Sequence, residues 1–477
     1  MKAILKAFSA VVLAGAMAVP ALAQTTSTND TTSTNTDAKD LKKVVEDQGI
    51  NYVQTAQKGI TLSGYVDTSY TEQFASPKSG FGGSSTGGQA LLHQFDVNSN
   101  SFNVNAVKIA LEQALPSTNT WAAGFRIDTM YGQDATILSA SDPVLGGSSV
   151  YVEQALVKVN IPVGNGIQLY MGKFVTLLGY EVIESPANPN FSRGLLFTNA
   201  IPLTNTGIYA DYKFNSTFEA KLGIVDGWNE SNSTPNTSSP GAATFFGPHL
   251  SSDASDDYPF GGKALTGQLV INAPGGNANV TQSFIYSPSG EPAGTFYGNY
   301  GTGLPSQTIG ADNGPIAVYD IWGNWNPTFV KDSALTLGFN IDFGYNGASG
   351  RPSSTYDVTT GAGPSTFFTG VNDSNTWWGA ALYTQYKVSK LLTLAARGEY
   401  LHEDSAWAPK FGAPGVSNDD FSETLTASFN IWDNLLTRVE YRYDHLTNGS
   451  TGVIGGPNNV ATFTNQDEIA VEAVYSF

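Results

Sequence analysis

Hydrophobic and polar positions alternate with a period of two over much of the chain, and the alternation is clearest at its C-terminal end. If residues 464–477 are extended, one face carries charged or small side chains, as at Glu468 and Glu472. The other face is apolar and ends on two aromatic rings: Ile469, Val471, Ala473, Tyr475 and Phe477. This arrangement is typical of a strand with lipid on one side and water on the other. We therefore expect this segment to close an outer-membrane β-barrel.

The same alternation recurs upstream, in 335–345, 392–403 and 435–446. A charged side chain that faces lipid near the midplane costs about 2–4 kcal/mol, so the charged faces should line a wet lumen. The predicted lumen wall comprises Arg126, Asp128, Asp342, Arg397, Glu399, Arg438, Glu440, Arg442 and Glu472. One run departs from the pattern, because Lys173 is in phase with the apolar residues of 167–175; a β-bulge or a position at the rim would explain it.

Sixteen strand-like runs follow Gly59, and the gaps between them are alternately long and short. The runs are 60–70, 97–115, 119–131, 149–161, 166–175, 204–214, 217–228, 263–272, 278–287, 316–326, 333–345, 376–388, 391–403, 421–431, 435–446 and the C-terminal run. Bacterial outer-membrane barrels have even strand numbers, short periplasmic turns and long external loops. The pattern predicts an all-β, transmembrane, antiparallel up-and-down barrel of about 16 strands; other divisions of the runs would give 14 or 18.

Residues 1–23 have the order of an export signal. Lys2 and Lys6 precede an apolar run that ends at Ala21-Leu22-Ala23, and this A-x-A-like ending disfavours the alternative of an uncleaved anchor helix. Residues 24–40 are mostly Thr, Ser, Asn and Asp, which cannot form a buried core. The predicted organisation is a signal peptide over 1–23, a polar periplasmic tether over 24–59 and an outer-membrane β-barrel over 60–477.

The composition supports a barrel. Charged residues make up 13% of the chain, aromatic residues 12%, and there are 51 Gly, which suits aromatic girdles and long loops. The formal net charge of −18 should repel nucleic acid, so no nucleic-acid partner is expected. The absence of Cys excludes thiol catalysis and disulfides. Candidates for the aromatic belts are Trp322, Trp325, Trp377, Trp378, Trp407 and Trp432.

Nothing in the sequence points to catalysis, a metal or a cofactor. The four His residues (His93, His249, His402 and His445) form no H-E-x-x-H or other tight ligand spacing. The acidic run 252–257 could offer oxygen ligands to Ca²⁺, but it lacks the EF-hand spacing, which favours a solvated loop. An outer-membrane hydrolase would need a Ser–His or Asp–His set, and no residues indicate one.

The long gap 176–203 differs from the other predicted loops because it is apolar. It carries Tyr180, Phe191 and the run 195–197, and an exposed loop of this composition would promote aggregation. In 16-stranded general porins the third external loop folds into the barrel and narrows the pore. We expect the same here, with Glu181, Glu184 and Arg193 at the pore constriction.

The run GKF…GYE…ESPANPNFSRGLLF within residues 172–207 resembles the outer-membrane β-barrel porins known as OmpL-like. The opening GYVDTSY at 64–70 and the closing aromatic fit the same family. The resemblance covers roughly residues 60–477 and implies a barrel porin. It brings neither a substrate nor catalytic residues.

The predicted function is a passive, water-filled channel for small hydrophilic solutes or ions in the bacterial outer membrane, without enzymatic activity. Its partners would be outer-membrane lipid and the solutes, and barrels of this size often form homotrimers. The net acidity favours a mild cation preference if the acids reach the pore. The rival prediction is a structural or interaction barrel with a plugged lumen, in which the loops bind a partner or the barrel sheathes another protein.

Two roles are open for the inward charges. Glu181, Glu184 and Arg193 would face wall arginines such as Arg126 and Arg438 and create a transverse field that selects solutes by charge. Alternatively, the wall arginines only pair with neighbouring carboxylates and stiffen the wall. Those carboxylates are Asp128, Glu399, Glu440 and Asp444.

Overall fold

The computed structural model describes residues 59–74, 93, 95–96, 98, 100–141, 149–228, 263–288, 295–296, 307–308, 315–330, 334–347, 352–355, 365–369, 374–404, 418–453 and 460–477. Apart from Gly59, the predicted signal peptide and tether lie outside the described residues. So do His249, Trp407 and the acidic run 252–257.

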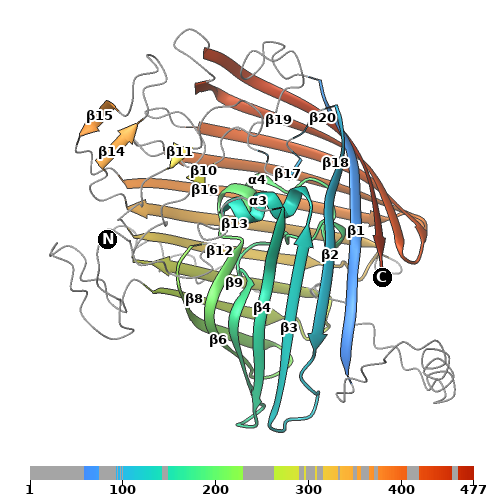
Figure 1. The fold of residues 1–477 in the computed structure, drawn as a ribbon. Helices are drawn as coiled ribbons and strands as arrows, with labels where there is room; N and C mark the ends of the chain where they lie inside the picture. The colour runs from blue at the N-terminus through green and yellow to red at the C-terminus, as the bar shows by residue number, and fades with distance from the viewer. Residues whose placement is uncertain are drawn as a thin grey trace, which may run out of the picture.

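Sixteen antiparallel strands form one closed barrel in the order β1-β2-β3-β4-β5-β6-β7-β8-β9-β12-β13-β16-β17-β18-β19-β20 (Figure 1). Their bounds are β1 Ile60–Gln73, β2 Ser101–Gln113, β3 Ala122–Tyr131, β4 Val150–Ile161, β5 Ile167–Val175, β6 Thr204–Lys213, β7 Phe218–Val225, β8 Ala264–Asn272, β9 Ala278–Ser287, β12 Ile316–Trp325, β13 Leu335–Gly347, β16 Ser374–Lys387, β17 Leu392–Asp404, β18 Asn418–Trp432, β19 Leu435–Val453 and β20 Val460–Ser476. The predicted 16-stranded barrel is confirmed.

Several shorter elements lie in the gaps where the sequence predicted only loops. They are the helix α3 Gln133–Ser141 and two small hairpins, β10 Thr295–Phe296 with β11 Gln307–Thr308 and β14 Pro352–Thr355 with β15 Ser365–Thr369. The gap 176–203, called the third loop below, contains a 3-10 turn over Ser185–Ala187 and the helix α4 Leu195–Asn199. Within the described residues, no helix has the length and apolar character that a membrane span requires.

Burial follows the predicted period of two, with the charged side chains on the covered inner face. In β19, Arg438, Glu440 and Arg442 are buried, whereas Val439 and Tyr441 are exposed. Exposed apolar side chains also occur on the opposite side of the barrel, for example Met171 and Leu222. An apolar outer face is stable in acyl chains and a polar inner face is stable in water, which explains the inverted pattern.

The C-terminal aromatic takes part in the closure of the barrel. β20 pairs with β1 from Tyr65 opposite Ser476 onward. Beyond this ladder, Phe477 N–H donates to Gly64 O at 2.9 Å, and Gly64 N–H donates to Phe477 O at 3.0 Å. A Cβ at Gly64 would lie 2.1 Å from the Lys108 carbonyl oxygen of β2 and 2.8 Å from the Phe477 ring, so the close approach requires glycine here.

The β-bulge, one of the two explanations expected for Lys173, is absent from the register of β5. β5 pairs with β4 and β6 without a shift, and Lys173 is opposite Ala155. Gly172 instead has a φ of +133°, and Lys173 is buried with its Nζ 4.1 Å from the centre of the Tyr151 ring. A positive φ at glycine thus accompanies the inward placement of a lysine that the period of two would face to lipid.

Part of the set predicted for the aromatic belts has the exposure that a belt requires. Trp325, Trp378 and Trp432 are exposed on the barrel. The prediction is wrong for Trp377, which is buried and donates its Nε1–H to Ala200 O of the third loop at 3.3 Å. It is also wrong for Trp322, whose ring lies 6.0 Å from that of Tyr180 in an edge contact. Both tryptophans occupy inward positions, because they share a strand face with Gly379 and Asp320 respectively.

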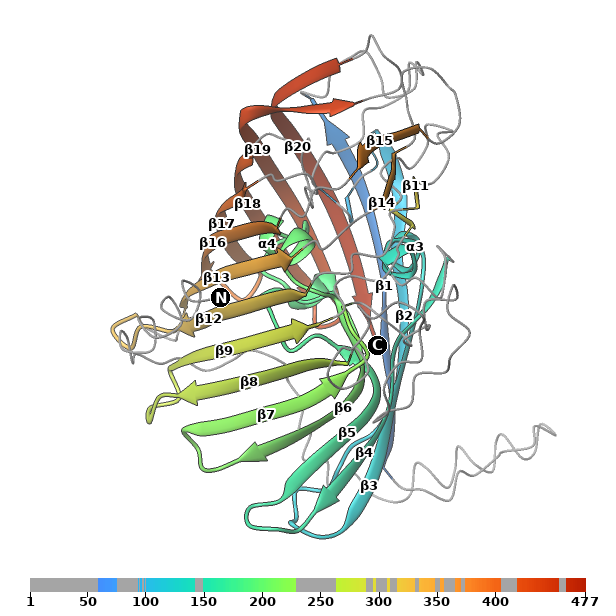
Figure 2. The same cartoon turned by 90° about the vertical axis from the view of Figure 1, so that its left-hand side faces the viewer.

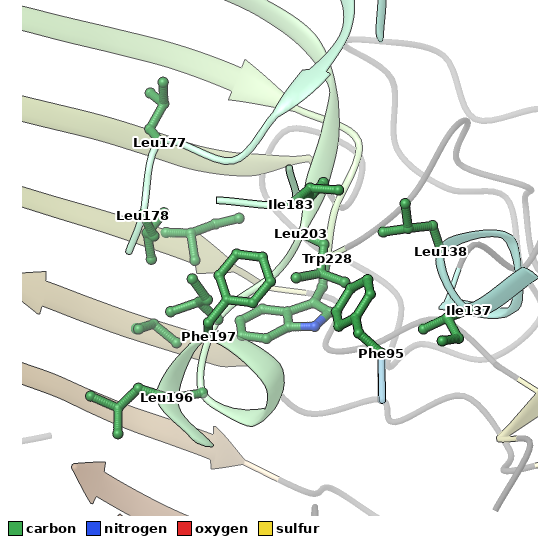
Figure 3. Packing of buried hydrophobic residues seen from close by; sticks show 14 of the residues in the cluster. Phe95, Ile137, Leu138, Leu177, Leu178, Ile183, Leu196, Phe197, Leu203 and Trp228 are labelled. Atoms are coloured by element: carbon green, nitrogen blue, oxygen red, sulfur yellow. The ribbon is translucent and has the colours of Figure 1, made fainter. Parts of the chain in front are cut away.

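A hydrophobic cluster occupies part of the barrel interior. Its members come from segments far apart in the sequence, including Phe95, Leu138 in α3, Phe197 in α4 and Trp228 (Figure 3). Figure 2 shows α4 inside the ring of strands. The third loop and α3 therefore share one apolar core within the barrel.

Candidate pore constriction

Arg438 of β19 binds the backbone of the third loop. Its Nη1 donates to Ser185 O at 3.0 Å and to Asn190 O at 3.2 Å, and its Nη2 donates to Asn188 O at 2.7 Å. The same guanidinium pairs with Glu472 of β20 at 3.2 Å, and both side chains are buried. One arginine thus binds three carbonyl groups of the loop in a covered site, and the Ser185 carbonyl also accepts the Asn188 N–H at 3.0 Å.

Arg397 of β17 makes a second attachment. Its Nη1 donates to Ser192 O at 2.6 Å and to Glu181 Oε1 at 2.7 Å, and its Nε lies 2.9 Å from Glu399 Oε2. Glu181 Oε2 accepts the N–H of Gly194 at 2.5 Å. Glu181 is therefore buried and links two parts of the third loop to the wall, rather than facing the lumen.

Wall carboxylates complement these arginines by accepting backbone N–H groups of the loop. Glu440 accepts from Phe191 N at 2.6 Å and from Ser192 N at 2.9 Å. Arg442 Nη1 donates to Arg193 O at 2.9 Å and pairs with Asp444 at 3.0 Å. Hydrogen bonds to charged groups are stronger than neutral ones, so this side of the loop is firmly fixed.

The start of the third loop is hydrogen-bonded to strands β8, β9, β12 and β13. Gly179 N–H donates to Asp320 Oδ2 at 3.1 Å, and Tyr180 N–H donates to Asn340 Oδ1 at 2.7 Å. Asp342 is directly opposite Asp320 in the β12–β13 register, and both are buried. Leu177 O accepts from Gln268 and Ser283 of β8 and β9, at 2.6 and 2.8 Å.

Arg193 lies at the junction of three segments. Its Nη2 pairs with Asp134 of α3 at 3.0 Å and donates to Ile183 O, and its guanidinium is 4.6 Å from the centre of the Phe95 ring. Burial raises the pKa of Asp134 to about 6, although the Arg193 guanidinium opposes this rise. Arg193 is thus enclosed among side chains and does not border open lumen.

Glu184 is the charged residue of the third loop that stays partly open, with 22% of its side chain exposed. Its carboxylate contacts the Lys108 ammonium of β2, which also lies 2.8 Å from Glu153 and 3.2 Å from Asp128. Burial raises the pKa of Glu184, but the attraction of Lys108 outweighs it and brings the pKa to about 2. The Glu184 carboxylate is therefore charged at all ordinary pH values.

The inner wall of β2 to β7 remains partly exposed in the half nearer the short turns. Arg126 pairs with Asp128 at 2.8 Å and with Glu112 at 3.5 Å, and Lys158 also contacts Glu112. The partly exposed charged side chains of this wall are Glu112, Arg126, Lys158, Glu219 and Lys221. This wall is polar and partly exposed where the third loop does not cover it.

Among the residues that the structure describes, two groups have a geometry that could hold a metal ion, and each already holds a protein cation. In the first, His93 lies 2.9 Å from Asp96 and 3.8 Å from Glu468, with Arg442 3.9 Å from Asp96. In the second, the Lys108 ammonium lies among Asp128, Glu153 and Glu184. We therefore assign no metal to either group.

The predicted site residues fall into two sets. Those beneath or within the third loop are Glu181, Arg193, Asp342, Arg397, Glu399, Arg438, Glu440, Arg442 and Glu472, all buried. Those beside the uncovered wall are Glu184, Arg126 and Asp128. Sequence reasoning missed Lys108 and Glu112. In β2 these two residues alternate with the apolar residues Val107, Ile109 and Leu111, and this alternation indicates that they face inward.

A model of the family described as "Putative beta-barrel porin-2, OmpL-like" matches residues 59–477. The chain belongs to this family. Family membership and the closed barrel together make it a porin-class β-barrel of the bacterial outer membrane, as the sequence predicted. The comparison with curated proteins gives no match.

Solved outer-membrane structures share the fold. A loop L8 deletion mutant of OmpT from Vibrio cholerae aligns at 12% identity with a TM-score of 0.50, over 88% of this chain and 99% of that one. The channel DcaP of Acinetobacter baumannii aligns at 11% identity with a TM-score of 0.50, over 89% and 99%. An anion-selective porin from Comamonas acidovorans aligns at 10% identity with a TM-score of 0.50, over 88% and 99%. At such identities the similarity concerns the fold.

Proposed function

We propose that this porin is a passive channel for small hydrophilic solutes or ions, and that solutes pass between the third loop and the inner wall of β2 to β7. The third loop forms one side of the constriction and the wall forms the other. Transport then depends on pore radius and lumen charge, and the barrel performs no bond chemistry.

The observation that carries this proposal is the uneven attachment of the third loop, which has more bonds to β17 and β19 than to β2. Its carbonyl and N–H groups bind buried charges on β17 and β19, such as Arg397, Arg438 and Glu440. The charged side chains on β2 to β7, such as Glu112 and Lys221, keep part of their surface exposed. The third loop is also fixed to β8, β9, β12 and β13, and it meets β2 through the Glu184–Lys108 pair. The part of the wall of β2 to β7 that the loop does not cover is therefore the part open to water and solute.

This attachment favours the second of the two roles considered for the wall arginines. Arg397, Arg438 and Arg442 are buried, so their guanidinium groups bind the third loop and do not contact a solute in the lumen. A transverse field would depend on the uncovered charges, namely Glu184 against Arg126 and Lys158.

Recording from single purified barrels in a planar lipid bilayer tests the proposal. We expect discrete ion steps, and a solute-exclusion series with neutral polymers should give a finite cutoff size. A protein that is folded by circular dichroism but gives no steps would contradict the channel. A preparation of unrelated, heat-unfolded barrel at the same detergent concentration controls for detergent artefacts.

The apolar cluster supports a second candidate function. Phe95, Leu138, Phe197 and Trp228 pack together inside the barrel, where a wide pore would hold water. A structural or interaction barrel with a plugged lumen would use such a cluster as its plug. The same bilayer recording separates the two, because a plugged barrel is silent. The predicted homotrimer also stays a prediction, which chemical cross-linking in mild detergent would test.

A further inference from the structure

Asp320 and Asp342 form a buried pair of carboxyl groups beneath the start of the third loop. The two residues are directly opposite each other in the β12–β13 register, and their side chains are in hydrogen-bonding contact. Neither is more than 1% exposed. Two ionised carboxylates cannot hydrogen-bond to each other, because neither has a donor. One member of the pair therefore carries a proton.

The hydrogen-bond partners of the pair place this proton on Asp342. Asp320 accepts one hydrogen bond on each oxygen, from Gly179 N–H at 3.1 Å and from Asn340 Nδ2 at 2.9 Å. Neither oxygen of Asp342 has such a partner among the described residues, since the Asn340 amide is nearby but donates to Asp320. A buried carboxylate without a donor is costly, whereas a carboxylic acid needs only one acceptor. Asp320 provides that acceptor.

No cation balances a second negative charge at this pair. Among the described residues, no Lys, Arg or His forms an ion pair with Asp320 or Asp342. Glu399 of β17 faces the pair, and the neighbouring Arg397 is bound to Glu399 at 2.9 Å and to Glu181 at 2.7 Å. The other adjacent strands place uncharged residues opposite the pair, Gly379 on β16 and Ser283 on β9. These surroundings disfavour a second ionised carboxylate.

The third loop covers the pair at two points of its length. Near the start of the loop, Gly179 donates its N–H to Asp320. Near its end, Leu196 of α4 lies over Gly379, the residue opposite Asp342, since a Cβ at Gly379 would be 2.9 Å from Leu196 Cδ1. Release of the loop would therefore admit water to Asp342 and allow it to ionise.

We propose that a proton on Asp342 holds the third loop on β12 and β13, and that a rise in pH releases the loop. The Asp342 hydroxyl donates to Asp320, which in turn accepts the N–H of Gly179. Loss of the proton leaves two adjacent carboxylates that repel each other. A solvated Asp is ionised above about pH 4, so the released loop holds one proton fewer than the docked loop. The ratio of released to docked loop should then rise by up to about tenfold per pH unit.

Infrared spectroscopy of the folded full-length barrel tests whether Asp342 holds a proton at neutral pH. The wild type should show the carbonyl stretch of a protonated carboxyl group, and Asp342→Asn should remove one such group while its amide still donates to Asp320. Asp226→Asn is the control, because Asp226 pairs with Lys263 Nζ at 2.8 Å and already has a cation. This variant should keep the wild-type band. Equal bands in the wild type and Asp342→Asn would overturn the proposal.

Single-channel recording at a series of pH values tests whether the proton holds the loop. The frequency of conductance substates in the wild type should rise by up to about tenfold per pH unit between about pH 6 and pH 8. In Asp342→Asn it should not change with pH, whereas Asp226→Asn should follow the wild type. A frequency that is independent of pH in the wild type, or that rises equally in Asp342→Asn, would overturn the proposal.

The recordings rest on the proposed channel function, and the two proposals fail in different ways. Wild-type channels that conduct without pH-dependent substates would overturn the role of the proton and leave the channel intact. An absence of ion steps would overturn the channel, and denaturant unfolding then tests the proton. Because unfolded Asp342 is ionised, the folding equilibrium constant of Asp342→Asn divided by that of the wild type should rise by up to about tenfold per pH unit. A constant quotient would overturn the proposal.

Discussion

Replacement of Arg438 by Met should release the third loop from the wall. Arg438 donates to three loop carbonyls, of Ser185, Asn188 and Asn190, and pairs with the buried Glu472. Met is of similar length but has no donor and no charge. The variant therefore removes the attachment while it keeps most of the side-chain volume.

The loss of stability in Arg438→Met follows from Glu472, the buried partner that remains. Removal of one member of a buried ion pair costs about 3–5 kcal/mol, because the other charge is left without a counter-ion. Ser185 Oγ still donates to Glu472, so we take the lower end of the range. A loss of about 3 kcal/mol raises the population of the released loop about 150-fold relative to the docked loop.

Single-channel recording measures this effect directly. A loop that leaves the wall intermittently should produce extra conductance substates and higher open-channel noise, with a shifted polymer cutoff. Arg126→Met is the control, because the ion pairs of Arg126 are with Glu112 and Asp128 and not with the third loop. Its channels should stay as quiet as the wild type.

Arg438→Lys separates the effect of the hydrogen bonds to the third loop from the effect of the positive charge. Lysine keeps the positive charge but cannot present the guanidinium fork that reaches several carbonyls at once. If Arg438 fastens the loop, the lysine variant should be noisy as well. Wild-type conductance, noise and cutoff in Arg438→Met would refute the reasoning, provided the variant barrel folds.

Three further predictions concern the core, the outer face and pH. Phe197→Ala in the apolar cluster should lower stability by about 3–5 kcal/mol, measured by denaturant unfolding in detergent; a loss below about 1 kcal/mol would mean that the cluster is loosely packed. Val439→Arg on the exposed face of β19 should cost about 2–4 kcal/mol if this face meets acyl chains, and no loss in a bilayer would contradict that orientation. Burial and Arg442 lower the pKa of His93, but the nearby carboxylates Asp96 and Asp444 outweigh them and raise this pKa to about 10. The protonated His93 therefore stabilises the folded barrel fully below about pH 6.5, and this contribution is lost as the pH rises through 10. The unfolding temperature of wild type should thus fall more steeply between pH 6.5 and 10.5 than that of His93→Gln, whereas parallel curves would show that His93 contributes nothing.

The sequence predicts the barrel well because a strand between lipid and water has to alternate. The run 435–446 assigns Arg438, Glu440 and Arg442 to one face, and the structure places all three inside the barrel. The loop rhythm likewise yields the correct number of strands. The exceptions are local, as at Lys173, which is buried next to Gly172 of positive φ without a change of register.

The site is less predictable because its contacts join residues far apart in the chain. The alternation indicates that Arg397 and Arg438 point inward, but it does not show that loop carbonyls rather than water would meet them. Arg193 carries no local signal for its pairing with Asp134, since α3 lies in a gap without clear periodicity. Trp377 was assigned to the lipid belt for a related reason, because in the pair Trp377-Trp378 the sequence alone does not fix which ring faces inward.

Thiol labelling of single-Cys variants tests the central claim most directly, since the chain has no Cys of its own and each introduced thiol reports on one position. Glu112→Cys lies on the partly exposed wall, whereas Thr426→Cys lies beneath the third loop, where Thr426 donates to Glu440 at 2.7 Å. A charged, membrane-impermeant thiol reagent added during bilayer recording should reduce the current through Glu112→Cys and leave Thr426→Cys unchanged. Block of Thr426→Cys with no effect on Glu112→Cys would place the water path on the other side of the third loop and contradict the account.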